Sequence, residues 1–127
     1  MSQPASLPFG VKLLLVFLGG CVGTGLRHGL DLLGGGYVST LIINALGAFL
    51  LGLFTSWVVR FPGPRGGAYR LFFATGMLGA FTTYSAYAVG WAADEEHVAA
   101  QLIAALVLLL IGLLMTALGL RLGRRDD

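Results

Sequence analysis

Charged residues and cysteine are both scarce in this sequence. Only 11% of the 127 residues are charged, whereas a soluble domain carries roughly 25%. The hydrophobic share is 57%, and the mean hydropathy is +0.86. This composition excludes a soluble globular domain and predicts a single transmembrane domain over residues 1–127. The single cysteine, Cys21, excludes an internal disulfide and is expected to pack as a small apolar residue.

Ionisable groups are also missing from the middle of the apolar runs, which removes several functions. No Asp, Glu or Lys lies deep in a run, where a proton- or cation-coupled transporter usually places a carboxylate. His and Cys form no cluster with metal-binding spacing, and no nucleophile has a base beside it. We therefore expect neither an enzyme nor a proton-coupled exchanger. The net charge of +2 comes mostly from arginines at segment ends, which suits a membrane surface and requires no nucleic acid.

Four apolar runs are present, and each approaches the ~20 residues that a membrane-spanning helix needs. They cover about residues 9–30, 37–59, 71–91 and 98–120. Residues 31–36 and the Pro/Gly segment 60–67 predict turns between the first three runs. Acidic residues 94–96 precede the fourth run and are expected to cap its helix. The sequence thus predicts an all-α membrane protein with four transmembrane helices.

The basic residues predict the orientation of these helices. Four spans place both termini and the segment after the second span on one side of the membrane. Seven of the eight basic residues fall on that side, namely Lys12, Arg60, Arg65, Arg70, Arg121, Arg124 and Arg125. Because cytoplasmic segments carry the excess of Lys and Arg, we expect a multi-pass protein of the cell membrane with cytoplasmic termini. Aromatic residues near the span ends are expected to anchor the chain in membrane lipid; they are Tyr37, Trp57, Tyr69 and Trp91.

The third run is polar at its centre. Its middle, Gly76-Met-Leu-Gly-Ala-Phe-Thr-Thr-Tyr-Ser-Ala-Tyr87, combines two glycines with three hydroxyl residues and suits an interrupted helix. In hydrocarbon, each backbone group left without a partner costs several kcal/mol, so a break persists only where protein, water or an ion replaces the lost bonds. We therefore predict that the third helix is broken at mid-membrane and that the break is an ion site.

Neutral hydrogen-bond donors and one arginine are the chemistry available inside the membrane. The donors are Asn44, Thr82, Thr83, Tyr84, Ser85 and Tyr87, and the arginine is Arg27. Without carboxylates, such donors suit a small anion, which Arg27 would concentrate at a mouth. Each residue also has a structural alternative. The hydroxyls can bond to their own helix, Asn44 can join two helices, Arg27 can reach the headgroups, and the tyrosines can pack.

Three motifs in order resemble the Fluc/CrcB family of fluoride channels, and the similarity covers nearly the whole chain. The first span carries Gly19-Gly20-Cys-Val-Gly-Thr-Gly-Leu-Arg27, like the glycine-rich segment of the family that ends in Arg. The second carries Asn44-Ala-Leu-Gly47, like its Asn-x-x-Gly pattern. The third carries Gly79-Ala-Phe-Thr-Thr-Tyr-Ser85, like its Thr-Thr-Phe-Ser break.

The resemblance implies an antiparallel dimer with two fluoride pores and passive fluoride export. It also implies a structural sodium ion at the dimer centre, held by the backbone carbonyls of Gly79 and Thr82 from each subunit. Asn44, Thr83 and Ser85 would line the pore. Tyr84 and Tyr87 would stand where the family has two phenylalanines whose ring edges face the ion. Arg27 would correspond to the arginine of the vestibule.

The chain departs from the family pattern in its aromatic residues, in Ala86 and in the fourth span. Both phenylalanine positions are tyrosine, Ala86 replaces a common Thr, and Thr116 is the only hydroxyl residue between 98 and 120. Homodimeric members are typically weakly biased in orientation, whereas this chain is strongly biased. We therefore weigh a homodimer against a heterodimer with an oppositely oriented paralogue. Two functions remain: a fluoride-conducting channel subunit, and a non-conducting structural subunit of a heterodimeric fluoride channel.

Overall fold

The computed structural model describes residues 6–34, 36–85, 88–89 and 97–124, and these residues form helices and their connections. Three long helices are α1 (Phe9–Gly34), α2 (Tyr37–Val58) and α6 (Val98–Gly123). Each is long and apolar enough to cross a membrane, with a mean hydropathy of 1.8, 1.9 and 2.7 in its most apolar window. The chain is therefore an all-helical, multi-pass membrane protein. The expected third span, about residues 71–91, falls on a segment whose described part is helical but divided.

The divided segment runs through three consecutive elements: α3 (Pro64–Tyr69), η1 (Arg70–Leu78) and α4 (Gly79–Phe81). Pro64 occupies the first turn, where its missing N–H costs no helical bond. η1 is a π-helix, and at its end the Gly79 N–H donates to the Ala74 carbonyl, five residues back. Thr82 then turns extended, with φ −72° and ψ 149°. The predicted interruption of the third helix is thus present at Thr82.

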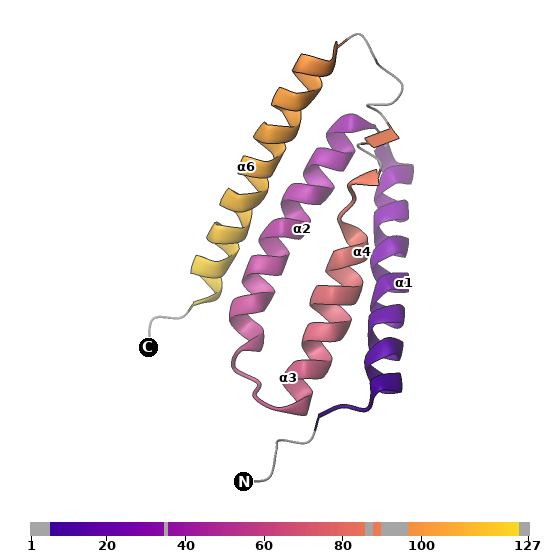
Figure 1. The fold of residues 1–127 in the computed structure, drawn as a ribbon, viewed down its shortest axis with the longest axis vertical. Coiled ribbons are helices and arrows are strands. Elements are labelled where there is room, and N and C mark those ends of the chain that lie inside the picture. The colour runs from indigo at the N-terminus through magenta and orange to yellow at the C-terminus, as the bar shows by residue number, and fades with distance from the viewer. Residues whose placement is uncertain (1–5, 35, 86–87, 90–96, 125–127) are drawn as a thin grey trace.

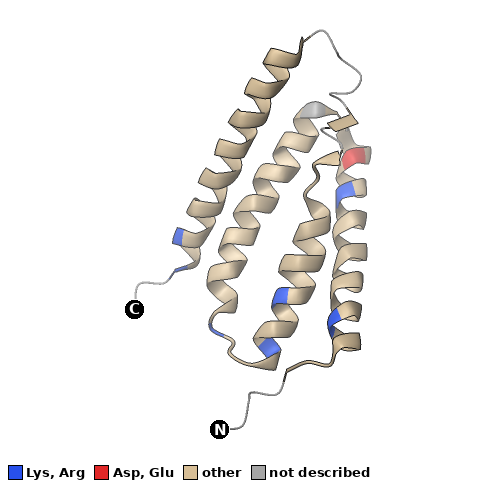
Figure 2. Cartoon of the chain, in the orientation of Figure 1, with Lys and Arg blue, Asp and Glu red and all other residues tan. Residues whose placement is uncertain are grey.

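The helices pack as two pairs (Figure 1). α1 runs along the segment from α3 to α4, and α6 runs along α2, which lies between α6 and that segment. The start of α1 and the end of α6 lie at the same end of the molecule, together with the turn between α2 and α3. Figure 2 shows that most of the described basic residues gather at this end, whereas one basic and one acidic position of α1 lie toward the other.

Glycines bring the backbones of both pairs into direct contact. In the first pair, a Cβ on Gly19 would collide with the Phe72 carbonyl oxygen, and a Cβ on Gly23 would collide with that of Met77. In the second pair, a Cβ on Gly119 would collide with the Phe49 carbonyl oxygen. In lipid the hydrophobic effect does not drive helices together. Close backbone approach stabilises helix association instead, because it increases van der Waals contact between the helices.

We expect Gly23→Ala to destabilise the folded chain, although alanine is the better helix former by about 1 kcal/mol. Its Cβ would meet the Met77 backbone, which cannot move as a side chain can. Overpacking of this kind costs about 1–3 kcal/mol. Thermal unfolding in detergent measures the effect. Gly20→Ala on the same helix is the matched control, because a Cβ there has no atom within 4 Å. Equal melting temperatures for the two variants would contradict the packing of α1 against η1.

The described core is small, and most large apolar side chains face outward. The buried hydrophobic residues are Ile43, Val58, Leu78 and Phe81. On α6, Leu114 is 68% exposed, and only 6% of the most apolar window is buried inside the chain. Such a surface needs lipid or another chain around it, as expected for a membrane protein.

The expected helix boundaries need three corrections. α1 continues through Asp31 to Gly34, so the turn is shorter than residues 31–36. The segment 60–67 does end α2, but its second half already belongs to the next helix, which begins at Pro64 rather than near residue 71. α6 ends at Gly123, three residues beyond 120. His97 is the N-cap of α6 and makes no side-chain capping bond, whereas the expected acidic cap at 94–96 lies outside the described residues.

Candidate functional site

The helix break leaves backbone groups of its last turn without their usual partners. The Thr82 N–H still donates to the Leu78 carbonyl at 3.1 Å, which is the last helical bond. The Thr83 N–H donates instead to Oδ1 of Asn44 at 2.8 Å. In an uninterrupted α-helix its acceptor would be the Gly79 carbonyl, four residues back. In the part of the chain that the structure describes, the Gly79 oxygen has a long contact of 3.5 Å with the Thr82 hydroxyl.

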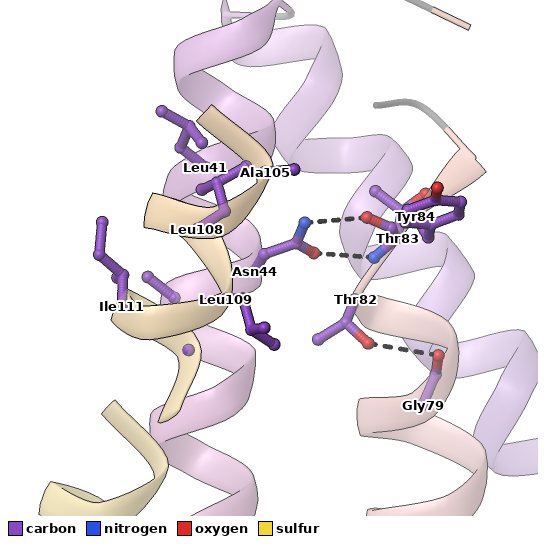
Figure 3. Close-up of a pocket in the computed structure, with 12 residues that line it drawn as sticks. Leu41, Asn44, Gly79, Thr82, Thr83, Tyr84, Ala105, Leu108, Leu109 and Ile111 are labelled. Carbon is purple, nitrogen blue, oxygen red and sulfur yellow. Dashed lines mark hydrogen bonds between the residues drawn. The ribbon is translucent and has the colours of Figure 1, made fainter. Parts of the chain in front are cut away.

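Asn44 clamps the break from α2 (Figure 3). Its Oδ1 accepts the Thr83 N–H at 2.8 Å, and its Nδ2 donates to the Thr83 carbonyl, also at 2.8 Å. One side-chain amide therefore satisfies both backbone groups of one residue. Because an unpaired backbone group costs several kcal/mol in hydrocarbon, the clamp stabilises the interruption. The expected alternative that Asn44 joins two helices is correct in this form, since Asn44 connects α2 to the break.

The close approach of α2 to the break depends on Gly47. Gly47 lies one helical turn from Asn44, and a Cβ on it would collide with Cγ2 of Thr82. The same Cβ would lie 3.3 Å from the ring of Phe81, which is only 6% exposed. A larger residue at position 47 would therefore require Thr82 and Phe81 to move or α2 to separate from the break. The spacing Asn44-x-x-Gly47 places the amide and the gap that it needs on one face of α2.

A cavity of about 550 Å³ adjoins the clamp. Figure 3 shows two unlike walls on either side of Asn44. The polar wall comes from α2 and the break, and it contains Asn44, Gly79, Thr82, Thr83 and Tyr84. The opposite wall comes from α6 and is apolar, with Ala105, Leu108, Leu109, Ile111 and Gly112. The site thus offers neutral donors and acceptors on one side only.

The hydroxyl of α6 does not add a polar group to this wall. Thr116 donates to the Gly112 carbonyl of its own helix at 2.9 Å and also lies 3.3 Å from the Ala48 carbonyl. These contacts direct the hydroxyl toward backbone oxygens of α6 and α2. The back-bonding alternative expected for such residues is also found at Thr82, whose hydroxyl lies 3.2 Å from the Leu78 carbonyl.

The other predicted site residues lie around the break with different exposures. The hydroxyls of Thr83 and Ser85 lie 3.2 Å apart. Tyr84 lines the cavity but is 75% exposed, and its ring lies on the far side of Thr83 from Asn44. Arg27 is half-buried on α1 and is not among the residues that line the cavity. Tyr87 lies outside the described residues.

Backbone oxygens are the available ligands for a cation at this site. Among the described residues no group of three or more His, Cys, Asp or Glu side chains comes together. The Gly79 carbonyl, whose helical amide partner has moved to Asn44, is the type of oxygen that holds Na⁺ at broken membrane helices. The chemistry of the break therefore fits a hard monovalent cation. The resemblance to the family, and not a side-chain metal motif, is what singled out the carbonyls of Gly79 and Thr82.

Comparison with known proteins gives a consistent family. Residues 14–120 match the family model described as CrcB-like protein, Camphor Resistance (CrcB). A protein of Thermus thermophilus named "Fluoride-specific ion channel FluC" is 42% identical over 88% of this chain and 93% of its own length. One of Mesorhizobium japonicum with the same name is 40% identical over 80% of this chain and 93% of its own. One of Leifsonia xyli, "Fluoride-specific ion channel FluC 2", is 45% identical over 70% of this chain and 68% of its own. Extent and identity together show that the chain belongs to the Fluc/CrcB family.

Proposed function

We propose that this chain is a subunit of a fluoride-selective channel that lets fluoride leave the cell passively. The observation that carries the proposal is the clamped break of the third helix, which opens onto a cavity with a polar wall. The relatives named as fluoride-specific ion channels support the identity of the ion. In this proposal the divided segment crosses the membrane as the third of four spans. The concentration of basic residues at one end supports cytoplasmic termini in the cell membrane.

Fluoride would meet the side-chain amide of Asn44, which has a donor that the clamp does not use. The Asn44 amide has two N–H bonds, of which one is spent on the Thr83 carbonyl. The second has no partner among the described residues, and Asn44 lines the cavity. Together with the hydroxyls of Thr83 and Ser85, it would replace part of the hydration shell of the anion. Tyr84 and Tyr87 would present ring edges, and Arg27 would raise the anion concentration at a vestibule.

The sodium ion and the dimer belong to the same proposal. The carbonyls of Gly79 and Thr82 from two antiparallel copies would hold a sodium ion, which would neutralise their converging negative ends. The extensive exposed apolar surface of α1 and α6 supports a second subunit in addition to lipid. Asn44 would act on this site indirectly, because its bond to the Thr83 N–H is what releases the Gly79 oxygen.

A non-conducting structural role is the second candidate, and the apolar α6 wall favours it. If both walls must be polar, this chain supplies only one, and an oppositely oriented paralogue supplies the competent pore. The strong charge asymmetry also supports a partner of opposite orientation. The number in the name "FluC 2" of the Leifsonia xyli relative is consistent with paired paralogues.

Fluoride efflux from proteoliposomes separates the two candidates. Vesicles that contain this chain alone and are loaded with fluoride are expected to release the fluoride once the membrane potential is held at zero. Vesicles loaded with chloride are expected to retain the chloride. A fluoride electrode follows the release. Efflux only after addition of a paralogue would support the structural role. No efflux in either case would contradict the proposal, provided that the reconstituted chain shows its native melting transition.

A further inference from the structure

A second cavity lies at the basic end of the molecule and has a different character. It measures about 520 Å³ and lies among α2, η1 and the end of α6. Its walls are apolar or aromatic, with Leu50, Leu53, Phe54, Trp57, Phe73, Met77, Leu78 and Leu122. Among the described residues that line it, Arg60 is the one that carries a charge. This combination of one cationic end and an apolar body matches an amphiphile with an anionic head.

Arg60 is held in place at the rim of this cavity. Its Nη2 donates to the Gly123 carbonyl at the end of α6, at a distance of 3.0 Å. This bond uses one of the five N–H groups of the guanidinium, and the side chain is exposed. The favourable interaction between a cation and a helix C-terminus adds to the bond. A phosphate would bind to the other N–H groups of the guanidinium.

An aromatic cluster places the same rim at the membrane interface. The rings of Trp57 and Phe61 lie 4.6 Å apart, those of Trp57 and Tyr69 5.9 Å apart, and those of Phe54 and Phe73 5.4 Å apart. Trp57 is 39% exposed and Tyr69 37% exposed. Trp and Tyr concentrate at the level of the headgroups, so the arginine beside them lies at the depth of lipid phosphates.

We propose that this cavity binds an anionic phospholipid, with the phosphate of the headgroup on Arg60 and one acyl chain along the apolar walls. Charge complementarity selects this occupant, since the described residues at this end include six basic groups and no carboxylate. Basic pockets between membrane helices on the cytoplasmic side are known to bind acidic headgroups. The lipid would bridge α2, η1 and the C-terminal end of α6. The proposal does not depend on which ion the protein conducts.

Trp57 supplies a direct probe, because it lines the cavity. The chain has two tryptophans, so Trp91→Phe leaves Trp57 as the only one. The protein is reconstituted in phosphatidylcholine vesicles. Brominated phosphatidylglycerol is added to one series of vesicles and brominated phosphatidylcholine to another. Quenching of Trp57 fluorescence in the two series gives the ratio of the binding constants of the two lipids. A preference of about fivefold for phosphatidylglycerol is expected from one basic residue. Arg60→Gln should remove the preference while keeping an N–H donor for the Gly123 carbonyl. Leu50→Phe, which fills the cavity, should weaken quenching by both lipids.

Matched controls decide whether the effect belongs to this site. Arg65→Gln removes a basic residue of the same end that does not line the cavity, and it should leave the preference intact. The proposal is overturned if both lipids quench equally, or if Arg65→Gln has the same effect as Arg60→Gln. It is also overturned if the preference appears only after deletion of residues 125–127, because the acidic C-terminus would then be the occupant. Protection of Trp57 from every brominated lipid, with cross-linking across the cavity, would assign the surface to a second copy.

Discussion

Asn44→Ala is expected to abolish fluoride efflux and to lower the melting temperature, because it removes the two hydrogen bonds that Asn44 makes to the Thr83 backbone. Loss of a bond to a buried polar group costs about 1–3 kcal/mol, and the low dielectric of the membrane places the loss at the upper end. We expect the rate of efflux to fall at least about 100-fold, which corresponds to a free-energy change of about 2.8 kcal/mol. Efflux from proteoliposomes and thermal unfolding in detergent measure the two effects on the same preparation.

Thr83→Val is the control for Asn44→Ala. It removes the hydroxyl that contacts Ser85 but keeps the Thr83 N–H and carbonyl, to which Asn44 is bonded. We expect this variant to melt close to the unsubstituted chain and to lose transport only in part. Comparison of the two variants separates the effect of the Asn44 bonds on stability from the effect of the pore hydroxyl on transport. If Asn44→Ala melted like the unsubstituted chain, Asn44 would act on the ion alone, and the clamp would be unnecessary.

Leu108→Ser is expected to increase fluoride efflux about tenfold. Leu108 lies on the apolar α6 wall of the cavity, and a serine there would give the anion a donor opposite Asn44. A hydrogen bond to a charged group contributes about 1.5–3 kcal/mol, which corresponds to tenfold or more in rate when the apolar wall limits passage. The assay is efflux from proteoliposomes that contain the chain alone.

Leu114→Ser on the same helix is the control for Leu108→Ser, because Leu114 is 68% exposed and does not line the cavity. It should leave the rate unchanged. A rise with Leu108→Ser alone would identify this cavity as the fluoride path and the α6 wall as its barrier. An unchanged rate with both variants would favour the structural role, in which the conducting pore belongs to the partner.

Hydropathy predicted the long helices closely, because lipid forces backbone groups to pair within one segment. The expected runs from about 9 and 37 begin at Phe9 and Tyr37 in the structure, and the run from 98 begins at Val98. The ends were less accurate. α1 stays helical to Gly34, about one turn beyond the expected end near residue 30, since a glycine-rich stretch does not by itself end a helix. Pro64 starts a helix because proline is tolerated in a first turn.

The sequence predicted where the third helix is interrupted. It did not predict which side chain bonds to the freed backbone groups. Gly79, Thr82 and Thr83 marked the break, and the structure interrupts the helix at Thr82. The bonds that connect Asn44 to the Thr83 backbone join residues 39 positions apart, and no local pattern encodes such a pairing. The requirement for glycine at position 47 follows from the same approach of α2. The π-helical form of residues 70–78 also had no signal, because the residue types there suit an ordinary α-helix.

Solid-state NMR of the chain in lipid bilayers tests the central claim most directly. With labels at Asn44, Thr82 and Thr83, chemical shifts report the backbone of residue 82, and dipolar couplings report the distance between the Asn44 side chain and the Thr83 amide. We predict extended torsion angles at Thr82 and an Asn44 Oδ1 to Thr83 N distance near 2.8 Å. Helical shifts through residues 82–84, with no coupling between Asn44 and Thr83, would contradict the account.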